Sequence, residues 1–356
     1  LGLGINYGQI ANNLPAPSRV VFLLGSLNIT RVKLYDADPV VLSAFSYTDV
    51  EFIIGLGNEY LQAMTDPVQA RAWIQQKVKP YIPDTKITCI AVGNEVLTGN
   101  DTKLMPLLLP AMQTIHGVLD DLGLSQQIRV TTAHSFGVLQ NSFPPSAGTF
   151  RNDLSEYMDS VLDFHARSGS PFLINAYPFF AYKDNPGEIS LSYALFEPNN
   201  GTTDAATGLR YDNMLYAQID AVYSAIRASG RGDAIRVQVS ETGWPSKGDA
   251  DEPGATVENA ELYNGNLIRR IERNEGTPGR PGEAVEVYVF ALFNEDLKPG
   301  PVSERNYGLF YPNGTPVYDA GLRAFLPGMM AYSSSTETVS SRKRCFLSFI
   351  LLLLLF

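Results

Sequence analysis

Cysteine and histidine are scarce in this sequence of 356 residues, which contains two cysteines and three histidines. Cys89 lies in an apolar run and Cys345 near the C-terminus, with no CxxC pair and no spacing typical of metal ligands. The sequence therefore offers no disulfide framework and no sign of a metal or cofactor. We expect Cys89 to be a buried thiol of the core.

Positive charge is also in deficit. Lys and Arg number 27 against 37 Asp and Glu, for a formal net charge of −10, and the body of the chain has no basic run. Nucleic acid and anionic membrane surfaces are therefore poor candidates as partners, and a neutral substrate is favoured. The 18 Tyr and 18 Phe offer stacking surface that suits sugars, although most must belong to the core.

No apolar run reaches the roughly 20 residues that span a bilayer. Residues 346–356 are almost wholly apolar and follow a Ser/Thr-rich stretch at 331–341 and a basic one at 342–344. This order fits a glycosylphosphatidylinositol attachment signal, with 336–345 as spacer and Ser333, Ser334 or Ser335 as the attachment residue. The alternatives are an apolar tail without a role and a vacuolar sorting extension, but an exposed apolar end favours aggregation.

We accordingly expect a catalytic domain at 1–327, a Ser/Thr-rich spacer at 328–345 and a removed apolar tail at 346–356. The mature protein is expected on the extracellular face of the plasma membrane, facing the cell wall and apoplast. Any signal peptide is expected to have been removed or to lie outside this sequence. Four N-x-[ST] triplets give weak support to a secretory route and are candidate glycosylation sites: Asn28, Asn100, Asn200 and Asn313.

Short runs dense in Val, Ile, Leu and Phe alternate with amphipathic stretches. The expected strands are 3–7, 31–35, 51–56, 87–92, 128–132, 172–176, 236–240 and 285–292. The expected helices are 17–27, 67–78, 104–122, 152–167, 213–228, 256–273 and 319–325. Strands apolar on both faces indicate a parallel sheet, and eight of them with intervening helices predict an α/β fold, the (β/α)8 TIM barrel. The rival is a doubly wound open sheet, but no GxGxxG follows the first strand.

The longest interruption, 183–212, is rich in Asn, Gly and Pro. It is predicted to be an elaborated loop after the sixth strand, on the C-terminal face of the barrel.

Functional residues of such barrels cluster at the C-terminal ends of strands. Glu95 ends the fourth expected strand and Glu241 ends the seventh, so the two lie nearly opposite one another across the mouth. Two carboxylates facing each other across a groove are what glycoside hydrolysis needs. The alternative is that each is a solvated surface glutamate. Asn58-Glu59 echoes Asn94-Glu95, and spacing alone does not choose between them, whereas strand position favours Glu95.

Six segments carry a resemblance to a known family. They are Ile5-Asn-Tyr-Gly-Gln-Ile-Ala-Asn-Asn-Leu-Pro15, Lys33-Leu-Tyr-Asp36, Val92-Gly-Asn-Glu95, Asn175-Ala-Tyr-Pro-Phe-Phe180, Ser240-Glu-Thr-Gly-Trp-Pro-Ser246 and Phe293-Asn-Glu-Asp-Leu-Lys-Pro-Gly300. In order and content, from residue 2 to 326, the chain resembles the plant glucan endo-1,3-β-glucosidases of glycoside hydrolase family 17. The resemblance implies a (β/α)8 fold and retaining endo-hydrolysis of β-1,3-glucan, with Glu95 as proton donor and Glu241 as nucleophile. It implies no cofactor, and it implies that Glu59 has no role in catalysis.

The same resemblance places further groups around the cleaved bond, namely Tyr35, Asn94, Tyr177, Phe180, Glu295 and Lys298. Asn94 is suited to hydrogen-bond the sugar 2-OH, and the two tyrosines to orient Glu241 or the sugar. Lys298 beside Glu295 would help keep Glu241 ionised, unless the two form only an i, i+3 salt bridge. Phe180, like Phe179 and Phe293, is either a sugar-stacking wall or part of the core.

The sequence leaves two further functions open. A glucanosyltransferase passes the covalent glucosyl-enzyme to another glucan, and the residues it needs are the same. A non-catalytic wall-glucan-binding protein on the same barrel is disfavoured because both glutamates are present. In each case the expected partner is a β-1,3-glucan, and the expected state is a monomer.

Overall fold

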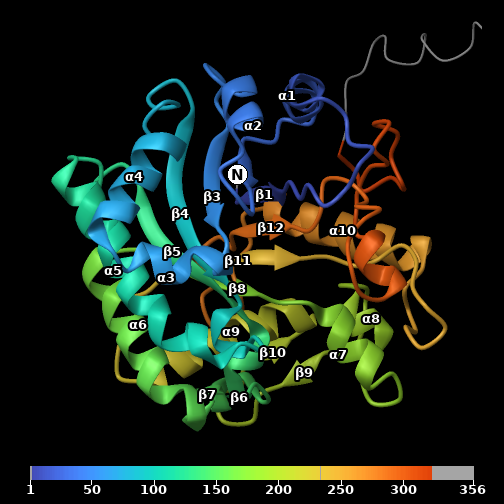
Figure 1. Cartoon of the computed structure of the whole chain (residues 1–356). Helices are drawn as coiled ribbons and strands as arrows, with labels where there is room; N and C mark the ends of the chain where they lie inside the picture. Colours follow the sequence, from blue (N-terminus) through green and yellow to red (C-terminus); the bar gives the residue numbers. More distant parts are fainter. Residues whose placement is uncertain (1, 233, 323–356) are drawn as a thin grey trace, which may run out of the picture. The chain divides into compact units, whose positions relative to one another are not determined.

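Eight parallel strands close into a barrel in the computed structural model, which describes residues 2–232 and 234–322. The strands are β1 (Leu3–Asn6), β2 (Arg31–Lys33), β3 (Glu51–Leu56), β4 (Lys86–Asn94), β5 (Arg129–Ser135), β8 (Phe172–Asn175), β11 (Val237–Thr242) and β12 (Val287–Val289). Each pairs with the next along the chain, and β12 closes on β1. The strands lie at the centre of the helices (Figure 1). The predicted (β/α)8 barrel is confirmed.

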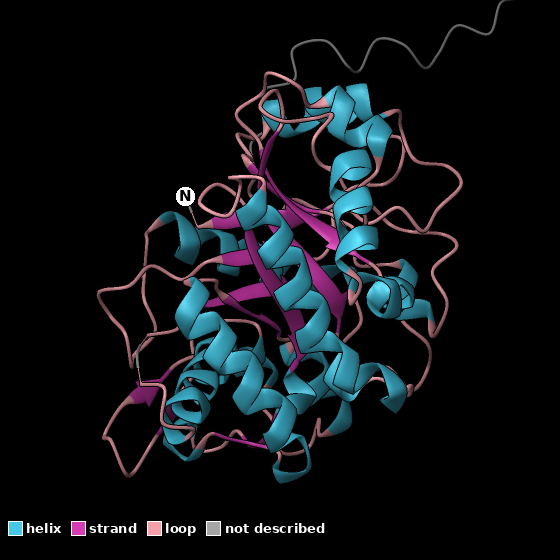
Figure 2. Cartoon of the chain, turned by 60° about the vertical axis from the view of Figure 1, so that its left-hand side comes forward, coloured by secondary structure: helices cyan, strands magenta, loops and turns pink. Residues whose placement is uncertain are grey.

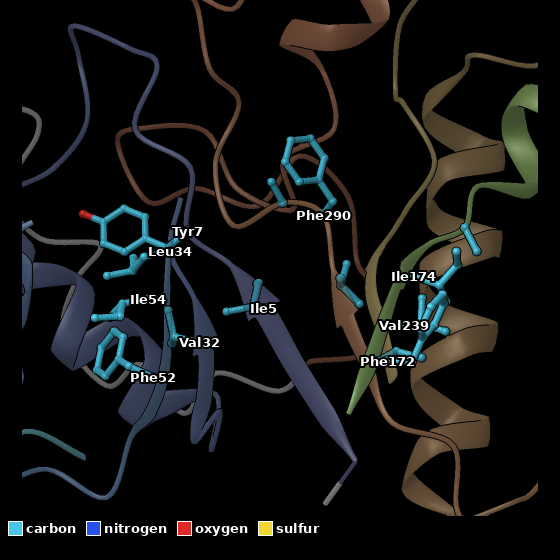
Figure 3. Packing of buried hydrophobic residues seen from close by; sticks show 14 of the residues in the cluster. Ile5, Tyr7, Val32, Leu34, Phe52, Ile54, Phe172, Ile174, Val239 and Phe290 are labelled. Atoms are coloured by element: carbon cyan, nitrogen blue, oxygen red, sulfur yellow. The ribbon is translucent and has the colours of Figure 1, made fainter. Parts of the chain in front are cut away.

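The strands are buried on both faces, as their composition predicts. Phe52 and Ile54 of β3 belong to the larger core, which also contains Ile5 and Val32 (Figure 3). A second, smaller cluster consists of Ile53, Cys89, Ala91, Ala133, Leu173 and Tyr288. Because successive side chains point to opposite faces of a strand, this cluster fills the barrel interior. Cys89 is the buried thiol expected, and burial raises its pKa to about 12.

Helices surround the strands (Figure 2). They are α1 (Pro17–Ser26), α2 (Pro39–Ala44), α3 (Leu61–Met64), α4 (Pro67–Lys77), α5 (Met105–Asp121), α6 (Ser155–Ser168), α7 (Pro178–Asp184), α8 (Leu191–Ala194), α9 (Met214–Ala228) and α10 (Val257–Glu272). Their ends follow local chemistry: the Asp66 side chain accepts a hydrogen bond from the Val68 amide at the start of α4. Gly169 ends α6 in the left-handed conformation, at φ 64°.

Shorter elements occupy the loops. The 3₁₀ turns are η1 (Asn58–Tyr60), η2 (Val96–Thr98), η3 (Thr102–Leu104), η4 (Phe136–Val138), η5 (Pro145–Ala147), η6 (Asn152–Leu154) and η7 (Val302–Arg305). Two small hairpins are formed by β6 (Leu139–Asn141) with β7 (Thr149–Phe150), and by β9 (Thr202–Thr203) with β10 (Arg210–Tyr211). The second hairpin and α8 belong to the predicted insert at 183–212. Asp204 fastens the insert to the neighbouring loop by accepting hydrogen bonds from the Ser146 amide (2.8 Å) and hydroxyl (2.9 Å).

One expected helix, 319–325, is wrong over residues 319–322. Gly321 lies at φ +78°, in the left-handed region that an α-helix does not contain, and its amide donates to the Asp319 carboxylate. Residues 323–325 lie outside the described residues. So do Ser333, Ser334, Ser335 and the proposed spacer and tail. Among the helices that are described, none combines the length and the apolar composition needed to cross a membrane.

Candidate active site

Glu241 lies near the end of β11, where the register with β8 shifts between Val239 and Glu241. Its carboxylate is buried and receives three side-chain donors. The Lys33 ammonium lies 3.0 Å and the Tyr35 hydroxyl 2.7 Å from Oε1, and the Tyr177 hydroxyl lies 2.9 Å from Oε2. The rings of both tyrosines meet Phe290 edge to face. The aromatic packing therefore holds two phenols against one carboxylate.

These donors decide the charge of Glu241. Burial alone would raise its pKa, because a carboxylate loses hydration in the protein interior. The Lys33 charge opposes burial most strongly, followed by the Tyr35 hydrogen bond, and Lys298 adds to them. The net effect is a Glu241 pKa below its usual value of 4.5, so the group is held ionised.

Glu95 follows β4, where the backbone is irregular. Gly93 and Glu95 both have left-handed backbones, at φ 70° and φ 55°. Asn58 stabilises this irregular end: its amide nitrogen donates to the Asn94 carbonyl (3.0 Å), and its oxygen accepts from the Asn94 amide (2.8 Å). A left-handed glutamate is strained unless its surroundings hold it, and this pair of bonds is one such restraint.

The surroundings of Glu95 are the opposite of those of Glu241. Burial raises its pKa, and the nearby Glu241 charge raises it further. The Asn175 amide donates to Glu95 Oε1 at 2.9 Å and opposes the rise only in part. The pKa of Glu95 is raised above 4.5, so of the two carboxyls it is the one that keeps its proton to higher pH.

Glu295 and Lys298 lie on the segment that follows β12. The Glu295 carboxylate accepts from the Ile10 amide at 2.8 Å, and burial raises its pKa. The Lys298 ammonium pairs with Glu304 at 3.1 Å and lies 3.9 Å from the centre of the Phe290 ring. Its charge nevertheless lowers the pKa of both Glu241 and Glu295.

A cavity of about 510 Å³ brings these groups together. Every catalytic and substrate-binding residue expected from the sequence lines it: Tyr35, Asn94, Glu95, Tyr177, Phe180, Glu241, Glu295 and Lys298. Asn94 also approaches the Asn175 amide, at 3.4 Å. Phe179 and Phe293, by contrast, are buried in the core.

A second cavity of about 1170 Å³ continues from the first. The two share Glu95, Tyr177 and Phe180, and the second is bordered by the insert through Tyr193, Asn200 and neighbouring residues. Phe143 also borders it, with 69% of its surface exposed. Together the cavities form a groove across the C-terminal ends of the strands, and the insert is one rim of it.

Glu59 is exposed and lines a third cavity of about 270 Å³, which shares Tyr35 and Asn94 with the first. Three functional side chains were missed by reasoning from the sequence. Lys33 opens the segment Lys33-Leu-Tyr-Asp36 and lies in an apolar strand run, where a lysine is itself a signal. Asn58 precedes Glu59 in the pair that echoes Asn94-Glu95. Asn175 belongs to a segment recognised for its resemblance, but not for its side chain. Within residues 2–232 and 234–322, no group of three or more His, Cys, Asp or Glu side chains is placed to hold a metal ion.

Comparisons with known proteins agree with this geometry. The family model described as glycosyl hydrolases family 17 matches residues 3–322. A curated relative, glucan endo-1,3-beta-glucosidase 14 of Arabidopsis thaliana, is 59% identical over 95% of this chain and 86% of its own length. Glucan endo-1,3-beta-glucosidase 11 of the same plant is 59% identical over 90% of this chain and 75% of its own.

Solved structures give the same picture. A beta-1,3-glucanase and pollen allergen of Cryptomeria japonica superposes with a TM-score of 0.85 at 41% identity, over 89% of this chain and 97% of its own. A structure from a study of two plant beta-glucan endohydrolases with distinct substrate specificities gives a TM-score of 0.81 at 38% identity, over 88% and 98%.

Proposed function

The chain belongs to glycosyl hydrolases family 17, and we propose that its endo-hydrolysis of 1,3-β-glucan proceeds with retention, Glu241 attacking and Glu95 moving the proton. The observation that carries this assignment is the opposite electrostatic surroundings of the two glutamates. Lys33 and two phenols favour the ionised form of Glu241 and its pKa is lowered, whereas burial and its neighbour's charge raise the pKa of Glu95. A nucleophile and an acid need these two states at the same pH.

In the first half of the reaction, the Glu241 carboxylate attacks the anomeric carbon while Glu95 gives its proton to the leaving glycosidic oxygen. In the second half, Glu95 is ionised and takes a proton from water, whose oxygen attacks the same carbon and releases Glu241. Asn94 borders the cavity beside Glu95 and is suited to bind the sugar 2-OH, a contact that strengthens in the transition state.

Substitution tests the two roles separately. Glu241→Gln removes the nucleophile with little change in size, and turnover of β-1,3-glucan should be lost while glucan binding and the fold persist. Glu95→Gln should retain its first half-reaction on aryl glycosides whose leaving group needs no proton, and added azide should then speed turnover because an anion needs no general base. Near-normal hydrolysis by Glu241→Gln would refute the assignment.

Stereochemistry gives an independent check. If the reaction retains configuration, the β-anomer should be the first product detected by proton NMR. Retention also requires the carboxyl groups of the two glutamates to lie about 5–5.5 Å apart. A first product in the α-configuration, or a separation near 9 Å, would indicate inversion.

The long groove supports internal cleavage of a curved β-1,3-linked chain. Its two cavities meet at Glu95, Tyr177 and Phe180, so sugars can extend to both sides of the acid. We expect cleavage of linear β-1,3-glucan within the chain, which releases oligosaccharides of several lengths, and little activity on straight β-1,4-glucan. Comparable rates on the two polymers would contradict this account of the groove.

Glucanosyl transfer is a second candidate activity, because the cavity beyond Glu95 can receive a second glucan after the leaving part of the first has gone. That cavity has room for a second glucan in the place of water. Product analysis separates the two outcomes: new reducing ends indicate hydrolysis, and chains longer than the substrate indicate transfer. The non-catalytic alternative is not supported, because the chain belongs to a family of hydrolases.

We further propose that the enzyme is held on the outer face of the plasma membrane by a lipid attached at Ser333, Ser334 or Ser335. The order of small residues, polar spacer and apolar end in the sequence supports this. Candidate glycan sites at Asn28, Asn100, Asn200 and Asn313 are all exposed, as a secreted glycoprotein requires.

The anchor can be tested with phosphatidylinositol-specific phospholipase C on membranes of expressing plant cells. The enzyme should be released, and a chain lacking residues 346–356 should never reach the membrane fraction. Enzyme that stays bound after treatment would refute the anchor and leave the glucanase assignment intact.

A further inference from the structure

Lys33 is a buried cation to which the segment Lys33-Leu-Tyr-Asp36 gave no role in the reaction. It is 2% exposed and lies at the end of β2, between the core residues Val32 and Leu34. Its ammonium lies 3.0 Å from Glu241 Oε1 and 4.2 Å from the centre of the Tyr35 ring. A lysine in such a place is costly unless its charge is balanced, and the ionised Glu241 provides that balance.

The two oxygens of Glu241 are not equivalent. Oε1 accepts from both Lys33 and Tyr35, whereas Oε2 accepts from Tyr177 alone. Oε2 therefore has the more accessible lone pairs and is the oxygen suited to attack the anomeric carbon. When it does so, Oε1 becomes the carbonyl oxygen of a neutral ester, still facing Lys33.

This change removes the partner of a buried charge. In the free enzyme Lys33 faces a carboxylate, but in the glucosyl-enzyme it faces only a carbonyl dipole. An unpaired buried charge is strongly unfavourable, so the ammonium destabilises the covalent intermediate relative to the states before and after it. As the ester bond to the sugar breaks, negative charge returns to the carboxylate that Lys33 already contacts, without reorganisation.

We propose that Lys33 is the counter-ion that makes Glu241 a good leaving group, and that it accelerates the second half-reaction rather than the first. In that step the bond between Oε2 and the anomeric carbon breaks and its electron pair stays on Glu241. The water oxygen forms the new bond to that carbon, and the water proton passes to Glu95. This inference rests on the proposed roles of Glu241 and Glu95.

The Lys33 charge affects the two half-reactions differently. The charge that stabilises the departing carboxylate also makes it a weaker nucleophile, so removing the charge should not slow the first half-reaction. With a slower second half-reaction, kcat and KM fall together and kcat/KM, which reports the steps through ester formation, is unchanged. A defect in positioning alone lowers kcat/KM and leaves no intermediate to accumulate.

The test uses Lys33→Met, which keeps the length of the side chain without the charge, and a 2,4-dinitrophenyl β-laminaribioside as substrate. We expect a pre-steady-state burst of dinitrophenol approaching one per active site. Steady-state kcat should fall at least tenfold, with kcat/KM within threefold of the parent. Intact-protein mass spectrometry of the quenched reaction should show the laminaribiosyl adduct. The measurements cover pH 4 to 8, because Glu241 without Lys33 needs a higher pH to ionise.

Tyr35→Phe is the matched control, because it removes a neutral donor from the same oxygen and leaves the cation. It should give no burst above that of the parent. Lys33→Arg, which restores the charge, should likewise show none. Lys33→Gln gives a second neutral variant in case Lys33→Met does not fold, as judged by circular dichroism and thermal unfolding, and it should accumulate the ester as well.

Two results would overturn the proposal. One is equal loss of kcat and kcat/KM in the neutral variants without a burst, and the other is an equal burst in Tyr35→Phe. A 2-deoxy-2-fluoro glycoside labels the nucleophile of the parent enzyme, and peptide mapping then identifies the labelled residue. This experiment distinguishes failure of the Lys33 proposal from failure of the proposed function. A label absent from Glu241 refutes the proposed function itself, whereas a label on Glu241 with no accumulation in Lys33→Met refutes only the role of Lys33.

Discussion

Two glutamates with the same chemistry acquire opposite charge states here because their neighbours differ. Glu241 lies against an ammonium and two hydroxyls, and each of these donors favours its anion. Glu95 receives one amide donor and faces the anion of Glu241. The charge on Glu241 is thus part of what keeps Glu95 protonated, so a change near one carboxylate alters the pKa of the other.

The pH dependence of kcat/KM on β-1,3-glucan should follow from these directions. The pKa of Glu241 is lowered, so the nucleophile is lost only as pH falls below about 4.5. The pKa of Glu95 is raised above 4.5, so Glu95 loses its proton, and the acid is lost, only at a higher pH. A bell-shaped profile should result. On a dinitrophenyl glycoside, which needs no acid, kcat/KM should keep its acidic limb and lose its basic limb. A basic limb that persists would argue against Glu95 as the acid.

Asn58 should matter for catalysis although it lies on a different strand end from both glutamates. Asn58→Ala removes the two hydrogen bonds to the Asn94 backbone, and we expect a loss of about 1–3 kcal/mol in the free energy of unfolding. Because Glu95 comes next in a strained conformation, kcat on glucan should fall about tenfold, equivalent to about 1.4 kcal/mol. Urea unfolding and steady-state kinetics measure both effects. Glu59→Gln is the adjacent control and should leave kcat unchanged, and a loss there equal to that of Asn58→Ala would contradict this distinction.

At the scale of elements, the strands were the most predictable part of the fold. Runs such as 51–56 are apolar on both faces because they separate two cores, and the structure reproduces that strand as Glu51–Leu56. Apolar periodicity is weaker evidence for the last helix, where the turn formed by Asp319 and Gly321 overrides it. Local turn chemistry outweighs pattern in short segments.

The site divides in the same way. The two glutamates near the ends of β4 and β11 were predictable, because topology alone brings the ends of barrel strands together. Lys33, although it ends β2, and Asn58 were not predictable, because their roles depend on which distant residue the side chain contacts. Lys33 contacts a residue 208 positions away, and Asn58 one that is 36 positions away. Contacts of that kind leave no periodic signal in one sequence.

The groove beyond Glu95 gives a prediction about long substrates. Phe143 borders it with 69% of its surface exposed, so its ring is open to a sugar in the groove. If a sugar ring stacks there at about 1 kcal/mol, Phe143→Ala should raise KM for long β-1,3-glucan about fivefold. Short oligosaccharides that do not reach it should show no change. Phe22→Ala is the matched control, since Phe22 is 71% exposed on α1. Equal effects of the two variants would remove Phe143 from the groove's binding surface.

At the scale of the whole molecule, the barrel wall contains two buried histidines without hydrogen-bond partners on their Nε2 atoms among the described residues. His134 of β5 stacks on Phe172, with ring centres 4.6 Å apart, and His165 of α6 meets the same ring edge to face. Burial lowers the pKa of both to about 3, and in His134 the neighbouring His165 contributes to this. Protonation of these two imidazoles is unfavourable in the folded state, where they are buried, but not in the unfolded chain, where they are hydrated.

Stability should therefore fall in acid. The folded pKa of about 3 lies below the ordinary value of 6.5, so the unfolded state binds more protons at every pH between them. Each histidine should remove about 1.4 kcal/mol from the free energy of unfolding per pH unit across that interval. Urea titrations at pH 7, 6, 5 and 4 measure the slope.

His165→Leu should lose stability at pH 7 through imperfect packing, yet show a shallower slope toward acid than the parent. His116→Gln removes a histidine that is only partly buried on α5 and serves as the control. A slope in His165→Leu as steep as the parent's would mean that carboxylates, and not this histidine pair, set the acid limit of the fold.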